Sequence, residues 1–119
     1  MAVKDVADEL VAGCREGRAR ANLQKLYAAD AVSVEAADMG NGRETHGLAG
    51  IDGKHQWWED NHEMTGGTVQ GPFMHGEDRF AVFFTAEGKT KADGKAFSMA
   101  EIGIYDVKDD KIVREEFYY

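Results

Sequence analysis

Apolar residues recur through the first half of the chain at the spacing of helices. The first stripe holds Val3, Val6, Ala7, Leu10, Val11 and Cys14, three or four residues apart. Gly17 predicts the end of this helix, and a second helix is expected from 19 to 27. The third stripe carries Leu48, Ile51, His55, Trp58 and His62. It predicts a helix that begins near 48 and ends near the glycine pair at 66 and 67.

The second half alternates between apolar and polar residues, as strands do. Strands are expected at 31–37, 68–75, 79–90, 96–107 and 111–119, with at most a short strand in the turn-rich segment 39–47. Turns at 76–78, 92–95 and 108–110 connect the last four as hairpins, so the sheet should be mostly antiparallel. Helices first and strands afterwards predict an α+β fold rather than alternating units.

Length and charge limit the classes of partner. The 119 residues are expected to form one domain over 1–119. The 22 Asp and Glu outnumber 14 Lys and Arg, and this net charge of -8 argues against nucleic acid and anionic membranes as partners. The single cysteine excludes an internal disulfide. The chain has no membrane-length apolar run and no signal-like start, so a cytoplasmic location is expected.

Strand alternation places Glu101 on an otherwise apolar face of the sheet. With a turn at 92–95, Ala86 lies opposite Glu101, and the same face carries Phe84 and Met99. The opposite face has Phe83, Ile102 and Ile104 in its middle. A second apolar face fits the surface of a homodimer.

The last hairpin decides whether Glu115 joins Glu101. A three-residue loop at 108–110 places Phe117 opposite Glu101 and Glu115 opposite Gly103, so that the two carboxylates are diagonal neighbours. A two-residue loop would flip the strand and turn Glu116 inward. The first register is favoured because its inward residues are more apolar.

Two segments of the chain resemble those of a known family. Leu26 to Val32 reads Leu-Tyr-Ala-Ala-Asp-Ala-Val, and Asp110 to Phe117 reads Asp-Lys-Ile-Val-Arg-Glu-Glu-Phe. With the order of elements, they resemble the SnoaL-like polyketide cyclases of the nuclear transport factor 2-like superfamily, which share the ketosteroid isomerase fold. The resemblance implies a curved sheet wrapped around three helices as a cone, an apolar pocket, dimers through the outer sheet face, and work mostly without metal or cofactor. This fold hosts several chemistries, so function must be argued from the site.

Four residues are candidates for acid–base catalysis. Glu101 and Glu115 on one apolar wall would raise each other's pKa, which suits proton transfer near neutral pH. Alternatively, Glu101 pairs with a basic residue and Glu115 lies in water at the sheet rim. By the resemblance, Glu35 falls where the isomerase keeps its proton-shuttling carboxylate, or it is a solvated strand residue. His62 is a proton-transfer partner or a packed histidine; with His55 and Glu59 it also resembles a helical metal set, but no metal is expected.

Five further residues are candidates for ligand binding: Trp58, Tyr27, Phe84, Met99 and Phe117. By the resemblance, Phe84 and Phe117 stand where the epoxide hydrolases keep an arginine and an aspartate, so that chemistry is not expected. We expect a protein that binds a small hydrophobic molecule, with proton transfer of the isomerase, cyclase or dehydratase type. The alternatives are a binding protein without catalysis and a dimeric interaction module.

Overall fold

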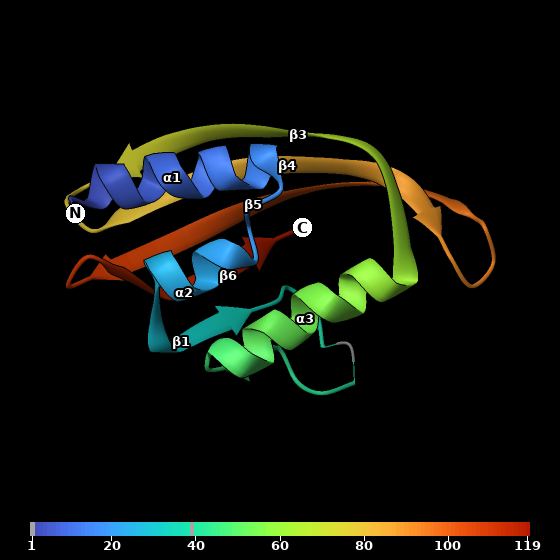
Figure 1. Ribbon diagram of the computed structural model, residues 1–119, viewed down its shortest axis with the longest axis horizontal. Coiled ribbons are helices and arrows are strands. Elements are labelled where there is room, and N and C mark those ends of the chain that lie inside the picture. The colour runs from blue at the N-terminus through green and yellow to red at the C-terminus, as the bar shows by residue number, and fades with distance from the viewer. Residues whose placement is uncertain (1, 39) are drawn as a thin grey trace.

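The computed structural model describes residues 2–38 and 40–119 of the chain. Within these ranges the elements are α1 (Val3–Glu16), α2 (Ala21–Leu26), β1 (Tyr27–Val34), β2 (Glu44–His46), α3 (Leu48–Asn61), β3 (His62–His75), β4 (Arg79–Thr90), β5 (Ala96–Lys108) and β6 (Lys111–Tyr118). The expected short strand in 39–47 is β2; Met39 lies outside the described residues. The predicted α+β fold with its curved, mostly antiparallel sheet is confirmed (Figure 1).

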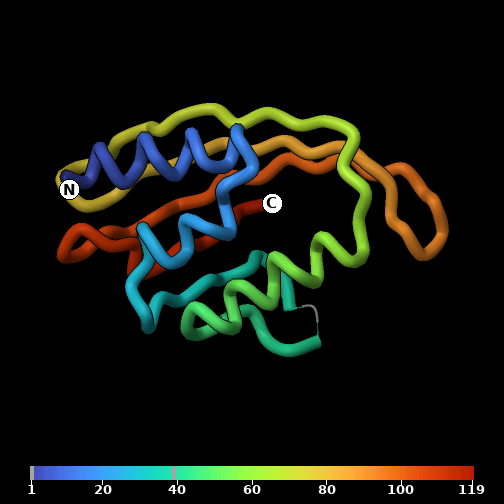
Figure 2. The backbone as a smooth tube through the Cα atoms, viewed as in Figure 1, coloured from blue at the N-terminus to red at the C-terminus, as the bar shows by residue number. Residues whose placement is uncertain are grey.

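The six strands form one sheet in the order β2-β1-β6-β5-β4-β3. Neighbours are antiparallel except for β1 and β6, which run parallel. The last strand therefore lies inside the sheet, beside the first long one, as the chain trace in Figure 2 shows. This pairing brings together residues that are more than 80 positions apart in the sequence.

The helices cover one face of the sheet, and the core fills the space between them. Helix α1 buries the stripe that its sequence predicts, including Val6 and Leu10, and is capped by Gly17, whose φ of 77° favours glycine. The Arg15 guanidinium donates two hydrogen bonds, of 3.1 and 2.7 Å, to the Val69 carbonyl and ties α1 to β3. Among the described residues no helix is long and apolar enough to cross a membrane.

The predicted end of the third helix near 66 is wrong, because α3 ends at Asn61. His62 has extended backbone angles and pairs with Thr90 at the start of β3. The Lys91 amide donates to the Asn61 carbonyl at 2.9 Å, and its ammonium donates to the Glu59 carbonyl at 3.0 Å. The β4–β5 hairpin thus satisfies carbonyls at the end of the helix, in place of a local sequence signal.

The register of β4 and β5 differs from the prediction by two residues. Phe84, and not Ala86, lies opposite Glu101, because the turn has the expected length but lies one position earlier, at 91–94: the Thr90 amide donates to the Lys95 carbonyl at 2.9 Å. A shift of two residues leaves every side chain on its predicted face. Phe80, Val82 and Tyr105 are accordingly buried on the inner face.

The predicted three-residue loop between β5 and β6 is also wrong. Lys108 pairs with Lys111, and the two-residue turn uses Asp109 and Asp110 at φ values of 51° and 63°. A bulge then follows, because Val107 pairs with Ile112 whereas Asp106 pairs with Arg114, which leaves Val113 as the extra residue.

The bulge cancels the flip that a two-residue turn would cause. Glu115 lies opposite Tyr105 and Phe117 opposite Gly103, so both keep the inner face that was predicted for them. Glu101 and Glu115 are not diagonal neighbours, since Gly103 and its partner lie between them.

Candidate functional site

A cavity of about 160 Å³ lies between the helices and the inner face of the sheet. Its walls consist of Leu10, Cys14, Ala19, Asn22, Tyr27, His55, Phe84, Glu101, Tyr105, Glu115 and Phe117. The sheet contributes both carboxylates and most of the aromatic rings, whereas the helices contribute the remaining polar groups.

Glu115 is held at the cavity by two hydroxyl groups. Its side chain is 4% exposed, and one carboxyl oxygen accepts a very short hydrogen bond from the Tyr27 hydroxyl. The other oxygen accepts from Ser33 Oγ at 2.6 Å, because β1 pairs with β6 in the register that sets Ser33 beside Glu115. Both oxygens therefore act as acceptors, as in a carboxylate, and the side chain is fixed in place.

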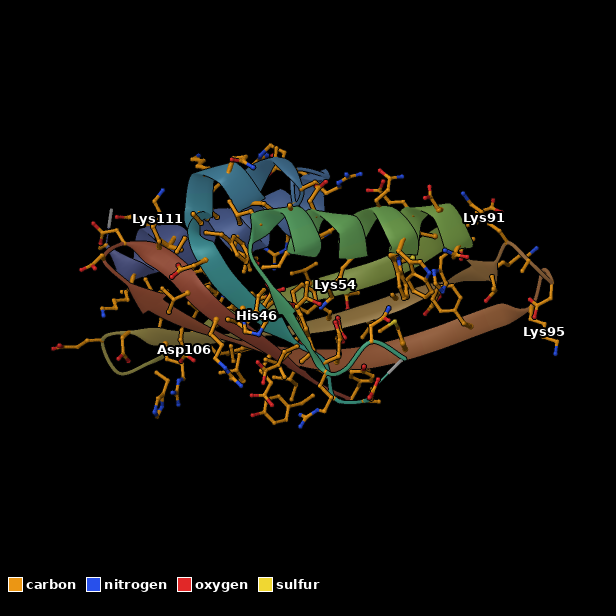
Figure 3. All side chains as sticks on the ribbon, turned by 90° about the horizontal axis from the view of Figure 1, so that it is seen from below. His46, Lys54, Lys91, Lys95, Asp106 and Lys111 are labelled. Carbon is orange, nitrogen blue, oxygen red and sulfur yellow. The ribbon has the colours of Figure 1, made fainter. Side chains whose placement is uncertain are left out.

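Lys54 reaches the same network from α3. Its ammonium donates to Ser33 Oγ at 2.7 Å and forms an ion pair of 2.6 Å with Glu35. The Tyr119 hydroxyl donates to the second oxygen of Glu35 at 3.1 Å. Figure 3 shows Lys54 extending from α3 toward the sheet. The lysine thus lies behind the cavity wall and supports Glu115 through the serine hydroxyl.

Glu101 differs from Glu115, because no hydrogen bond or ion pair holds its carboxyl group within the described part of the chain. Its pKa rises from 4.5 to about 7. Burial is the largest cause, and the negative charges of Glu35 and Glu115 act in the same direction, against a smaller opposing effect of Lys54. Glu101 therefore exchanges a proton near neutral pH.

The remaining titratable groups on the cavity wall are held in uncharged forms. Burial raises the pKa of Tyr105 well above 10 and raises that of the Cys14 thiol to about 11. Burial also lowers the pKa of His55, although the nearby Glu115 opposes the shift. Among the described residues, no group accepts a hydrogen bond from the Tyr105 hydroxyl. This hydroxyl lines the cavity and can therefore donate to a ligand.

The structure brings five of the predicted site residues together around this cavity: Glu101, Glu115, Tyr27, Phe84 and Phe117. Glu35 lies outside the lining, but its charge acts on Glu101 and its carboxylate holds Lys54. Their roles in binding or catalysis stay predictions.

The other predicted residues lie elsewhere. Trp58 stacks on His62 with ring centroids 3.8 Å apart, and Phe97 contacts both rings edge-on. Neither Trp58 nor His62 lines the cavity, and Met99 is half-buried outside it. Because α3 ends early, His62 begins β3, and the helical set that it resembles together with His55 and Glu59 does not form; no cluster of three metal-ligating side chains occurs in residues 2–38 and 40–119.

Four polar residues of this region were not among the predicted site residues: Ser33, Lys54, His55 and Tyr105. Strand alternation already sets Tyr105 on the same face as Glu101. His55 lies on the same stripe as Ile51, which is buried, and this spacing was its available signal. Ser33 and Lys54 belong to different elements, and nothing in their sequence spacing indicates that they touch.

A family model described as a SnoaL-like domain matches residues 1–119. The chain belongs to the SnoaL-like family. A candidate SnoaL-like polyketide cyclase from Mesorhizobium loti is 37% identical, with all of both chains covered and a TM-score of 0.92. The comparison with curated proteins finds no match.

Two more distant structures share the fold of this SnoaL-like chain. One is a Catenulispora acidiphila protein with a ketosteroid isomerase-like fold, in complex with trimethylamine; it is 20% identical, with 95% of this chain and 84% of that chain covered and a TM-score of 0.73. The other is a candidate polyketide cyclase from Pseudomonas putida, 19% identical over 100% and 92% of the chains, with a TM-score of 0.71.

In this SnoaL-like fold, the cavity wall combines one carboxyl group that titrates near neutral pH with polar groups that are fixed in position. Glu101 can give or take a proton, Tyr105 can donate a hydrogen bond, and Glu115 is a fixed negative group. These parts suit general acid–base chemistry.

Proposed function

We propose that this SnoaL-like protein catalyses proton transfer, without a cofactor, on a small and largely apolar molecule that carries a carbonyl or hydroxyl group. The observation that carries the proposal is Glu101: a carboxyl group on the cavity wall, without a partner among the described residues, whose pKa is about 7. A general acid or base works best when its pKa lies close to the working pH.

The proposed reaction begins with proton removal next to a carbonyl group. The Glu101 carboxylate takes the proton, and the electrons of the C–H bond shift to form an enolate, whose oxygen carries the charge. The Tyr105 hydroxyl, kept protonated by its raised pKa, is the donor available to that oxygen. Glu101 then returns its proton to another carbon or to the oxygen, so that the product is an isomer of the substrate.

Hydrogen–deuterium exchange tests this proposal without knowledge of the natural substrate. Cyclohexanone is incubated with the protein in D₂O, and NMR follows the loss of the protons next to the carbonyl. We expect the rate to rise through neutral pH as Glu101 loses its proton, and to fall at least 100-fold in Glu101→Gln. Glu87→Gln, on the exposed outer face, is the control for loss of one negative charge. Equal exchange by wild type and Glu101→Gln would refute the proposal.

A binding protein without catalysis is the second candidate. It is supported by Glu115, whose two oxygens are both taken up by Tyr27 and Ser33. Among the described residues of the cavity wall, Glu101 is then the one carboxylate free to act on a ligand. In the exchange experiment, addition of the ketone to a binding protein changes the NMR chemical shifts of the cavity residues. The protons next to the carbonyl of the ketone are then not exchanged for deuterium.

We also propose that two copies of the chain associate through the outer face of the sheet. Several large apolar side chains of this face are exposed, with 56% for Phe73, 42% for Ile102 and 53% for Tyr118. They lie along a shallow surface formed by β3, β4, β5 and β6. An apolar patch of this kind is typical of an interface between protein chains.

A further inference from the structure

The size of the cavity limits what it can hold. Its volume of about 160 Å³ is close to the roughly 150 Å³ of an engineered apolar cavity that binds one benzene molecule. A molecule with one ring fills such a space, whereas the second ring of a fused pair must either stay outside in the opening or push the walls apart. The rigidity of these walls therefore decides the size of ligand.

The helical end of the cavity is tied down by hydrogen bonds. The Asn22 amide donates to the backbone carbonyl and the carboxylate of Glu9, at 3.2 and 3.0 Å. Arg18 holds the same carboxylate at 2.9 Å. Asn22 also packs so closely on Gly13 that a Cβ atom there would overlap its amide. Helices α1 and α2 are thus locked together at this end.

The sheet side is equally constrained. The Tyr105 ring stacks on the fully buried Phe80, with centroids 4.9 Å apart and planes 9° from parallel. The edge of the ring lies against Gly103, where a Cβ atom would be 2.9 Å from Tyr105 Cε2. Phe84, like Phe117, is half-buried, so removing its ring costs the core less than removing a fully buried ring such as that of Phe80.

The charge of the cavity excludes anions. Its lining has two carboxyl groups, and its one basic side chain, His55, has a pKa lowered by burial. The nearest ammonium, that of Lys54, is engaged by Glu35 and Ser33 behind the wall. A negatively charged ligand would meet the Glu115 carboxylate in a desolvated space, where repulsion is strong.

We infer that the ligand of this cavity is an uncharged molecule of single-ring size, with its apolar body against Phe84 and Phe117 and one oxygen toward Glu101 and Tyr105. Polycyclic molecules and carboxylates should bind more weakly, the first because the tied walls leave no room inside for a second ring and the second because of the two carboxyl groups. The inference rests on the proposed function for the presence of that oxygen, but it goes further in assigning size and charge.

Binding of four defined probes tests this inference, by protein-observed NMR titration at neutral pH. The pair of cyclohexanone and the two-ring ketone 1-tetralone measures the effect of ligand size on affinity. The pair of benzamide and benzoate measures the effect of ligand charge. We expect wild type to bind cyclohexanone at least tenfold more tightly than 1-tetralone, and benzamide at least tenfold more tightly than benzoate. Equal or reversed affinities in either pair, or no binding of any probe, would overturn the inference.

Variants of the wall make the test specific to this cavity. Phe84→Ala should improve binding of 1-tetralone at least tenfold, whereas Phe83→Ala removes the same ring from the outer face and should leave the preference unchanged. If Phe84→Ala does not fold, Ala19→Leu fills the cavity instead and should weaken cyclohexanone binding. An unchanged preference in the folded variant overturns the inference.

The two proposals fail in different ways. Size-selective binding without deuterium exchange supports the inference and refutes catalysis. If deuterium exchange depends on Glu101 but is equally fast for cyclohexanone and 1-tetralone, the result supports catalysis and overturns the size limit.

Discussion

Replacing Glu101 by glutamine should stabilise the protein at neutral pH. The raised pKa means that the folded state holds a proton that the unfolded state releases, with values of about 7 and 4.5. Stability of the wild type is therefore fully present below pH 4.5 and falls as the pH rises toward 7. Glutamine keeps the shape and the hydrogen-bonding capacity of the side chain but does not titrate. The free energy of unfolding of the variant should therefore exceed that of the wild type by an amount that increases with pH across this range.

The size of the gain follows from the pKa difference. At 1.36 kcal/mol per pKa unit, the interval from 4.5 to about 7 corresponds to an upper limit of about 3.4 kcal/mol. Glu101 is only partly buried, and solvent screening reduces this figure to roughly 1–2 kcal/mol. For a chain of this length, each kcal/mol moves the midpoint of thermal unfolding by about 3–6 °C.

Urea unfolding of both proteins at several pH values between 4.5 and 8 measures this difference. The stability difference should be close to zero at pH 4.5, grow through pH 6, and level off above pH 7. Glu87→Gln, on the exposed outer face, controls for the removal of one carboxylate. If Glu101→Gln is instead less stable at pH 8, a positive group holds Glu101 in the folded state, and its part in acid–base chemistry loses its basis.

Three further predictions concern the network and the outer face. Glu115→Gln should lower the free energy of unfolding by about 2–4 kcal/mol, because the NH₂ group of glutamine replaces one of the two oxygens that accept from the buried hydroxyls of Tyr27 and Ser33. An unchanged urea midpoint contradicts this prediction. Lys54→Met should raise the pKa of Glu101 above about 7, since Lys54 lowers it, whereas Lys95→Met, at the tip of the β4–β5 hairpin, should not; carboxyl ¹³C NMR titration measures both. Light scattering should give a dimer for the wild type and a monomer for Ile102→Asp, and a monomeric wild type at micromolar concentration refutes the proposed interface.

The inner face of the sheet could be predicted because alternation along a strand does not depend on its pairing. Glu101 and Phe84 were placed on the correct face although their register was wrong by two residues. Phe117 and Glu115 reached the predicted face by a different route, through a two-residue turn and a bulge. The apolar pattern determines which side of a strand is buried, and the backbone adjusts its turns to satisfy it.

The polar network could not be predicted, because it depends on contacts between distant elements. The end of α3 is set by Lys91 on the β4–β5 hairpin, and this is why His62 begins β3 and does not extend the helical stripe that carries His55. Ser33 touches Glu115 only because β1 and β6 pair in parallel. Such pairings have no local signature in the sequence.

The bulge at Val113 also determines where this strand can lose a residue. Deleting Val113 would leave Asp106 opposite Arg114 and Tyr105 opposite Glu115, so the strand would become regular without any change of partners. Deleting Glu116 would instead move Phe117 to the solvent side and bring Tyr118 inward. Gaps between aligned relatives are therefore expected at 113 and not beyond it, and the hairpin can shorten by one residue while the cavity keeps its carboxylate.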